Sequence, residues 1–205
     1  MAGYTTLAEY GEFEYEDRRS VFIGQAASVS TENDALKFIE SVRRRFPDAR
    51  HHVYAYSLRD NSIARFSDDH EPQGTAGLPV LDALRKRGIV DAVIVVTRYF
   101  GGTLLGTGGL VRAYTAAAQG AVEASGLRVY DNYSLFEIVL TYSDHGKATS
   151  VLEGGDFRTE SIRYTDKVQL EGKIPSLGEQ SFVKALTEAT GGRCEIKKIG
   201  EKFDF

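Results

Sequence analysis

The chain has 205 residues, of which 42% are hydrophobic and 26% are charged, and this composition excludes global disorder. Its formal net charge of -4 excludes a protein that coats DNA or RNA nonspecifically, because such binding grows with the number of phosphates that Lys and Arg neutralise. Cys194 is the only cysteine, which excludes an intramolecular disulfide and a cysteine metal cluster and favours the reducing cytoplasm. No signal-like start or stretch of about 18 apolar residues occurs, so we expect neither export nor a membrane-spanning helix.

The first part of the chain alternates predicted strands and helices. Partial alternation of apolar and polar residues predicts two strands or one bent hairpin from Glu12 to Val29. A helix follows, opened by Thr31 and ended by Pro47, with apolar side chains on one face. His52 to Leu58 is typical of a strand, and after a polar segment a second helix is expected over Leu78 to Arg87.

A nearly continuous run of β-branched apolar residues, Ile89 to Thr97, predicts a central strand that is covered on both faces. The glycine-rich segment RYFGGTLLGTGG follows at once. After it, the alanine-rich stretch LVRAYTAAAQGAVEAS predicts a helix from residue 110 to 125, ended by Gly126.

Beyond about Asp131 the predicted order becomes strand, helix, strand, strand, helix, strand, which is the split-βαβ, ferredoxin-like plan. Ser176 and Glu179 have the spacing of a capping box at the start of its second helix. The sequence therefore predicts an α+β protein with two domains, over residues 1–130 and 131–205, joined by a short connection.

Five glycines fall within nine residues, from Gly101 to Gly109, between the central strand and the helix. Bare backbone amides at a helix N-terminus bind anions, and Arg98 and Arg112 flank the segment with guanidinium groups. The alternative is that these glycines only permit a tight turn and close helix packing. The spacing matches neither a Walker loop nor a dinucleotide fingerprint, so we expect no nucleotide or other cofactor.

A second polar segment, from Phe66 to Gly77, places Asp68, Asp69, His70 and Glu71 in succession. Carboxylates and an imidazole at this density suit a divalent metal or acid–base chemistry. The alternative is a solvated acidic loop leading to a helix that Thr75 caps.

Two further groups of polar residues have both a functional and a structural interpretation. His51 and His52 begin a strand, so their side chains point to opposite faces and cannot share one metal ion, although either can face a pocket. The basic triplets 43–45 and 85–87 sit at helix ends, where the dipole favours cations. If both triplets lay on one face, they would form a basic strip able to contact RNA.

The segments HHVYAYSL, FSDDHEPQGTAGLPVLDAL and VTRYFGGTLLGTGGLVRAY together resemble the signature of the IMPACT family and its bacterial YigZ-like members. The resemblance covers about residues 15 to 125, and the tail resembles the smaller domain that bacterial members append. One position departs from the family pattern, since His70 stands where a glycine is usual. A positive φ there would strain His70.

The resemblance implies that the first domain has the two-layer βα fold of ribosomal-protein and elongation-factor domains, and that the tail resembles another elongation-factor domain. Eukaryotic members are known as translation regulators. No established catalytic role comes with the matched positions, which favours a binding protein over an enzyme. The positions carried over as binding residues are His51, His52, Asp68, Asp69, Glu71, Gly74, Thr75, Gly77, Arg98, Tyr99, Gly101, Gly102, Gly106, Gly108, Gly109 and Arg112.

Two functions remain open at this point. In the first, a cytoplasmic binding protein docks on RNA, the ribosome or a translation factor through the glycine-rich segment. In the second, a small metal-assisted hydrolase or transferase uses the Asp68–Glu71 loop together with His51 or His52. No membrane partner is expected in either case.

Overall fold

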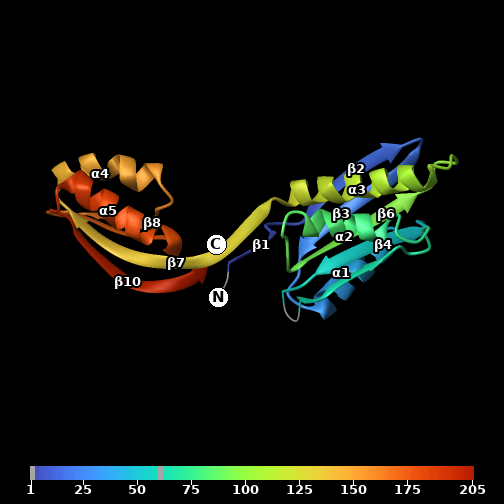
Figure 1. Cartoon of the computed structure of the whole chain (residues 1–205), viewed down its shortest axis with the longest axis horizontal. Coiled ribbons are helices and arrows are strands. Elements are labelled where there is room, and N and C mark those ends of the chain that lie inside the picture. Colours follow the sequence, from blue (N-terminus) through green and yellow to red (C-terminus); the bar gives the residue numbers. More distant parts are fainter. Residues whose placement is uncertain (1–2, 60–61) are drawn as a thin grey trace. The chain divides into compact units, whose positions relative to one another are not determined.

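The computed structural model describes residues 3–59 and 62–205, and two compact units divide the chain (Figure 1). The N-terminal unit is Tyr4–Val129, and the C-terminal unit contains Gly3 and Tyr130–Phe205. Residues 60 and 61 belong to the polar segment between the strand predicted over His52 to Leu58 and the helix predicted over Leu78 to Arg87, and they lie outside the described residues. Within the described ranges, no helix is both long and apolar enough to cross a membrane.

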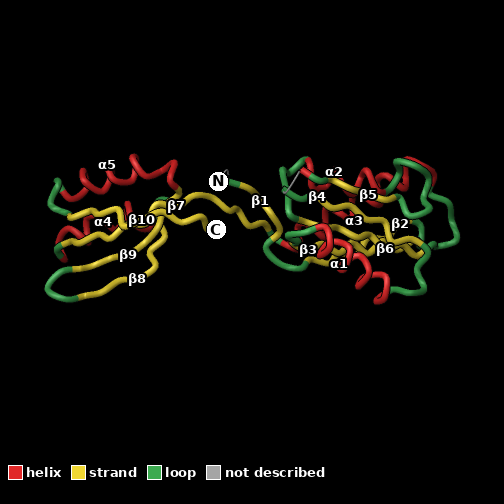
Figure 2. The backbone as a smooth tube through the Cα atoms, turned by 90° about the horizontal axis from the view of Figure 1, so that it is seen from below, coloured by secondary structure: helices red, strands yellow, loops and turns green. Residues whose placement is uncertain are grey.

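The N-terminal unit is built on an antiparallel sheet with the strand order β2-β3-β6-β4-β5 (Figure 2). Its central strand is β6, which confirms the prediction made from the β-branched run. The hairpin predicted near the N-terminus is also confirmed, as β2 and β3. The short strands β1 and β5 were not predicted. The strands of the unit are β1 (Tyr4–Leu7), β2 (Gly11–Asp17), β3 (Ser20–Ser28), β4 (His51–Ser57), β5 (Ala64–Ser67) and β6 (Ala92–Tyr99).

Helices cover both faces of this sheet. Val93 and Val95 of β6 belong to a core under α1 (Glu32–Arg45), whereas Ile94 and Val96 belong to the core under α2 (Gly77–Arg85) and α3 (Gly106–Ser125). Such a division follows from the alternation of side chains along a strand. The α+β class is confirmed, and the helices on both faces add one layer to the two-layer arrangement that the resemblance implied.

The helix ends differ from the predictions in two of three cases. The amide of Asp34 donates to Thr31 Oγ1 over 3.1 Å, so Thr31 caps α1 as expected. Thr75 does not cap α2. Its hydroxyl donates to the Pro72 carbonyl over 2.6 Å, and Ala76 occupies the cap position without a side-chain bond. The third helix, α3, begins at Gly106, so it takes in the last three glycines of the segment that was expected to precede it.

The C-terminal unit confirms the βαββαβ order, and its sheet order β10-β7-β9-β8 is that of the split-βαβ plan. Two helices pack on one face around Phe182 and Leu186. The capping box predicted at Ser176 is wrong, because residues 176–178 form a separate 3₁₀ turn and Glu179 accepts from Ser134 and Lys198 instead. The elements are β7 (Leu127–Leu140), α4 (Tyr142–Gly154), β8 (Arg158–Tyr164), β9 (Val168–Pro175), α5 (Glu179–Thr190) and β10 (Glu195–Asp204).

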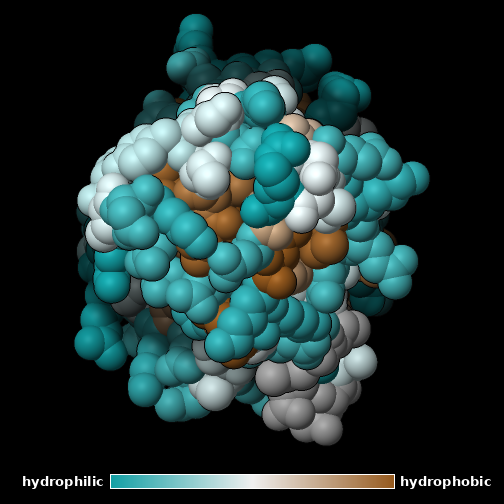
Figure 3. Space-filling model, turned by 90° about the vertical axis from the view of Figure 1, so that its left-hand side faces the viewer, coloured by the Kyte–Doolittle hydropathy of each residue, from teal (hydrophilic) through white to brown (hydrophobic). Residues whose placement is uncertain are grey.

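The C-terminal unit faces the viewer in Figure 3, where most of the surface is hydrophilic and hydrophobic residues show only in patches. A shallow hollow of about 340 Å³ between α4 and α5 has Val151, Ile174 and Phe182 in its lining. No group of three or more His, Cys, Asp or Glu residues that could hold a metal ion accompanies it among the described residues.

Candidate functional site

The candidate site lies at one end of the N-terminal sheet, where the glycine-rich segment leaves β6. The register brings three other segments to that end. Arg98 pairs with His51 at the start of β4, and Tyr99 pairs with Val21 next to the turn between β2 and β3. The acidic loop before α2 also reaches it, since the Asp69 carbonyl lies 2.9 Å from His51 Nδ1. Segments distant in the sequence thus meet around the glycines.

The glycines divide into two groups with different roles. The Gly101 amide donates to Ser20 Oγ over 3.1 Å, and a side chain at Gly101 would collide with the Arg19 backbone. Gly102 and Gly106 have φ of 85° and 69°, which favour glycine. For these three positions the structural interpretation of the segment holds, because each permits a turn or a close approach.

Gly108 and Gly109 instead lie in the first turn of α3. Among the described residues, a side chain at Gly108 would meet only Arg112, whereas one at Gly109 would lie 2.9 Å from Leu105 Cβ. No side chain among the described residues caps this helix, so its first amides remain available to an anion. The Arg112 side chain points back along the same turn. Its Nη1 lies 3.8 Å from the position that a Cβ at Gly108 would occupy. The helix terminus and one guanidinium group therefore lie together.

Arg98 is not the free cation that the sequence suggested. Its side chain is buried at 6% exposure, and its Nη1 donates to Glu71 Oε1 over 2.6 Å. Tyr114 donates to the same oxygen over 2.7 Å, and His51 Nε2 lies 3.9 Å from it. Burial raises the pKa of the Tyr114 hydroxyl, and the charge of Glu71 raises this pKa further. One carboxylate thus holds Arg98 inside the unit.

The carboxylates of Asp68 and Asp69 in the acidic loop accept hydrogen bonds from backbone amides. Asp68 accepts from the amides of Gly74, Ala76 and Gly77 at 2.9, 3.1 and 2.8 Å, so it caps α2 from a distance of several residues. Asp69 accepts from the His52 amide over 2.7 Å. Across the described ranges, no group of three His, Cys, Asp or Glu residues is placed to hold a metal ion.

Strain is present in this loop at the position where the family usually has glycine. Asp69 has a φ of 42° and His70 a φ of 70°, both in the left-handed region. The strain expected at His70 is therefore present. Backbone strain of this kind persists only where the surrounding contacts impose it, and the bonds of Asp68 and Asp69 are such contacts.

The two histidines lie on opposite sides of β4, as their positions predict. His51 reaches Glu71, whereas His52 Nε2 lies 3.0 Å from the Phe46 carbonyl, next to α1. Burial lowers the pKa of His52, although the Phe46 carbonyl acts in the opposite direction. Both histidines are thus partners of the backbone or of a buried acid, and they share no pocket.

The sequence did not single out three arginines at this end. Arg18 and Arg19 form the two-residue turn between β2 and β3, with φ of 48° and 66°, and Arg50 precedes β4. All three are exposed, as is Arg112, and none of the four makes an ion pair with a described residue. The two-residue spacing between alternating strands was the signal that could have located the first pair.

The basic strip that the sequence allowed does not form. The triplets end α1 and α2, which lie on opposite faces of the sheet. Most of their members pair locally, including Arg45 with Glu12 and Arg87 with Glu123. They are explained by helix ends and ion pairs.

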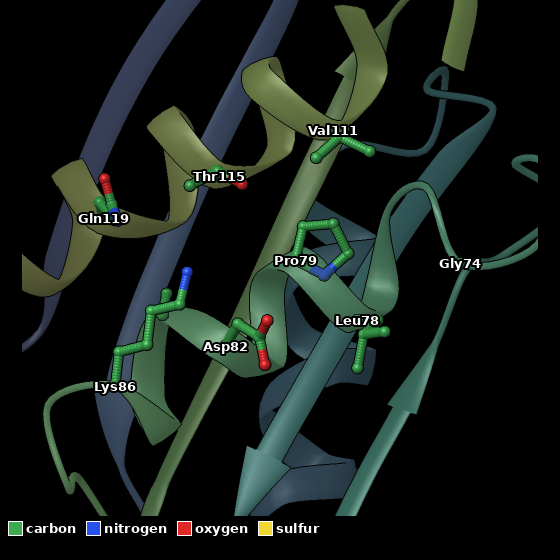
Figure 4. A pocket seen from close by; sticks show the side chains of 9 residues that line it. Gly74, Leu78, Pro79, Asp82, Lys86, Val111, Thr115 and Gln119 are labelled. Atoms are coloured by element: carbon green, nitrogen blue, oxygen red, sulfur yellow. The ribbon is translucent and has the colours of Figure 1, made fainter. Parts of the chain in front are cut away.

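The hollows of the N-terminal unit include two whose linings contain residues predicted as site residues. One, of about 460 Å³, lies at the glycine-rich end and is lined by Asp48, Arg50, Arg98, Tyr99 and Phe100. The other, of about 230 Å³, runs between α2 and α3 (Figure 4). Leu78, Pro79 and Val111 form its apolar part, with Asp82, Lys86, Thr115 and Gln119 along it.

Comparison with known proteins gives matches over nearly the whole chain. The family model described as the Impact N-terminal domain matches residues 18–122, and a domain of unknown function, DUF1949, matches residues 138–193. A crystal structure titled as that of a hypothetical protein is similar, with a TM-score of 0.61, 31% identity and coverage of 98% of each chain.

Curated relatives from several organisms are similar in sequence. The IMPACT family member YvyE of Bacillus subtilis is 36% identical over 202 residues, which cover 97% of this chain and 92% of YvyE. The IMPACT family member YigZ of Escherichia coli is 33% identical, covering 91% and 93%. Protein IMPACT of Rattus norvegicus is 30% identical over 94 residues, which cover 44% of this chain and 30% of the rat protein.

Proposed function

Because the chain belongs to the IMPACT family, we propose that it is a noncatalytic, cytoplasmic protein of translation that docks on RNA of the ribosome. The docking surface is the arginine end, which we define as Arg18, Arg19, Arg50, Arg112 and the segment from Phe100 to Gly109. One observation carries the proposal. Four exposed arginines without an acidic partner among the described residues lie at the end where the first amides of α3 are uncapped.

The charge arrangement suits a phosphate backbone. The whole chain carries a net charge of -4, so binding to RNA must come from a local cluster of cations. Guanidinium groups donate two parallel hydrogen bonds to a phosphate, which makes arginine better than lysine for this purpose. The turn at Arg18 and Arg19 has positive φ at both positions and fixes where these two side chains leave the sheet.

Exposed apolar side chains accompany the cations. Phe100 is 52% exposed and Leu104 is 81% exposed, at the start and in the middle of the glycine-rich segment. Aromatic side chains beside cations bind unpaired bases by stacking, and this contact tolerates different base sequences. The arginine end therefore has the two features of a surface for single-stranded RNA.

Ribosome and RNA co-sedimentation tests this proposal. We expect the triple variant Arg18→Ala/Arg19→Ala/Arg112→Ala to lose most of the binding, and the loss to be larger at low salt. A matched control, Arg163→Ala/Lys197→Ala, removes two exposed cations of the C-terminal unit and should leave binding unchanged. If wild-type protein sediments no more than an unrelated acidic protein, or if both variants behave alike, the proposal is wrong. Binding to a purified translation factor but not to RNA would point to the protein partner instead.

The enzymatic alternative has weaker support. It requires Asp68, Asp69 and Glu71 to be free for metal or substrate, yet each of these carboxylates already accepts hydrogen bonds within the unit. A substrate screen with added Mg²⁺, Mn²⁺ or Zn²⁺ tests this alternative. Turnover that disappears in Asp69→Ala would support it.

A further inference from the structure

We infer that the 460 Å³ hollow at the arginine end is a subsite for one ribonucleotide, with its base against Phe100 and its phosphate at Arg50. This inference rests on the proposed function and names the chemical unit that the site takes. The hollow has the volume of a small-molecule site. Its lining joins two segments, since Asp48 and Arg50 precede β4, whereas Arg98, Tyr99 and Phe100 end β6.

Arg98 supplies a donor that the protein leaves unused. Its Nη1 is engaged by Glu71, but its Nε is buried and has no hydrogen-bond partner among the described residues. A buried donor without a partner is unfavourable, and native structures rarely keep one without a reason. Arg98 lines the hollow, so its positive charge acts on an anionic ligand seated there.

The guanidinium of Arg98 is also held in place before any ligand arrives. Its central carbon lies 5.3 Å from the Phe22 ring centroid and 5.6 Å from that of Phe100. Glu71, itself held by Tyr114, fixes the far side of the group. A donor fixed in this way loses little side-chain entropy on binding. The half-exposed ring of Phe100 then offers a surface for stacking a base.

The remaining two side chains specify the rest of the ligand. Arg50 is exposed and makes no ion pair with a described residue, so it can meet one phosphate. Asp48 lines the hollow with a carboxylate, which is a hydrogen-bond acceptor, and ribose hydroxyls are donors that suit a carboxylate in nucleotide sites. Its negative charge disfavours a di- or triphosphate. The lining therefore fits a ribonucleoside monophosphate unit, either free or within an RNA chain.

Titration with small probes tests the subsite directly. Binding of adenosine monophosphate, its 2′-deoxy counterpart and inorganic phosphate is measured by calorimetry or by NMR shifts of the Phe100 and Arg98 signals. We expect the ribonucleotide to bind at least about 5-fold more tightly than the deoxyribonucleotide. Phe100→Ala should weaken ribonucleotide binding about 5-fold or more, the loss expected for one stacking contact. Asp48→Ala should abolish the preference for ribose.

Controls and a second ligand source complete the test. Tyr164→Ala removes an exposed aromatic side chain of the C-terminal unit, and Asp156→Ala removes an exposed acid there, so neither should change binding. The same variants are compared on a ribo-oligonucleotide and its DNA counterpart. If Asp48→Ala removes the preference for ribose on the oligonucleotides but leaves the free nucleotides unaffected, that result supports the subsite and identifies its ligand as a nucleotide within an RNA chain. Equal binding of ribo- and deoxyribonucleotides, in both forms and in all variants, overturns the inference.

The two proposals fail in distinguishable ways. If the arginine end binds RNA but the hollow takes no ribonucleotide, Arg18→Ala/Arg19→Ala lowers RNA affinity, free ribonucleotide does not bind, and Asp48→Ala keeps the RNA affinity of the wild type. If the hollow binds free ribonucleotide but the protein does not dock on RNA, Phe100→Ala and Asp48→Ala change nucleotide binding and no variant changes RNA sedimentation.

Discussion

Next to the arginine end, three side chains meet at one buried carboxylate, that of Glu71. Glu71 accepts from Arg98 and Tyr114 and lies near His51, and both members of the ion pair are almost fully buried. Removing one member of such a pair leaves the other charge buried without compensation. The interaction of Arg98 with Glu71 therefore matters for the fold of this end before it matters for a ligand.

We predict that Glu71→Ala destabilises the N-terminal unit by about 3–5 kcal/mol, the cost of breaking a buried pair. The double variant Glu71→Leu/Arg98→Met removes both charges and should recover most of this loss. Urea denaturation, monitored by tyrosine fluorescence, measures the free energy of unfolding of the single and the double variant. A single-variant cost under about 1 kcal/mol would mean that Arg98 reaches solvent when Glu71 is absent.

At residue 70 the backbone has a conformation that favours glycine, but the residue is a histidine. His70 has a φ of 70° and is exposed, and its ring makes no hydrogen bond or ion pair with a described residue. We predict that His70→Gly stabilises the protein by up to about 1 kcal/mol, because glycine adopts this φ without strain. His70→Val should destabilise it by about 1–2 kcal/mol. Thermal unfolding of the two variants gives the comparison, and a Val variant as stable as Gly would contradict the strained backbone.

Among the elements, β4 and α1 meet at a titratable contact. His52 is 7% exposed and lies at the Phe46 carbonyl, just after the last residue of α1. Burial holds its pKa below the ordinary value of an unfolded chain. Below pH about 6.5 the unfolded chain therefore takes up a proton that the native chain does not. The free energy of unfolding consequently decreases as the pH is lowered.

We predict that unfolding of the N-terminal unit becomes easier as pH falls from about 7.5 to 5, and that His52→Gln flattens this dependence. The glutamine amide can donate to the same carbonyl but does not titrate. Denaturation midpoints across this pH range test the prediction for each protein. An unchanged slope in His52→Gln would assign the pH dependence to other groups.

The elements also mark what the sequence could and could not predict. Periodicity located α1, which buries one regular face, and a continuous apolar run located β6, which is buried on both faces; the cap at Thr31 depends only on residues three apart. The cap of α2 comes from Asp68, eight and nine positions before the amides that it accepts from, so no local motif indicates it. The four residues of β5 are too few to give a period.

In the candidate site, too, local sequence could not predict contacts between residues that lie far apart in the chain. The family signature marked Arg98 and Glu71, but only the fold could show that they pair with each other across 27 positions. Arg50 lies outside the glycine-rich segment and reaches the same hollow through the register of β4 with β6. Local sequence thus predicted the glycine turn, and tertiary contacts decided which arginine is buried and which are exposed.

On the scale of the whole molecule, each unit has its own hydrophobic core. Leu186 is fully buried in the core of the C-terminal unit, together with residues of β7, β9 and α4. The N-terminal unit has two further cores, one on each face of its sheet. Compact units with separate cores can in general unfold separately.

We predict that Leu186→Ala destabilises the C-terminal unit by about 2–5 kcal/mol, as expected for a cavity at a buried leucine. Hydrogen exchange should become faster across β7 and β9 while β6 keeps its protection. Equal acceleration in both units would show that they unfold together, and the arginine end could then not be treated as a property of the N-terminal unit alone.

The most direct test of RNA docking is the salt dependence of binding to a single-stranded ribo-oligonucleotide. Four phosphates neutralised by four arginines give a slope of log K against log salt of about -3, and Arg18→Ala/Arg19→Ala/Arg112→Ala should reduce it to about -1. We predict that change of slope together with a loss of affinity. Identical slopes for the wild type and the triple variant would contradict the assignment of the arginine end as the RNA-binding surface.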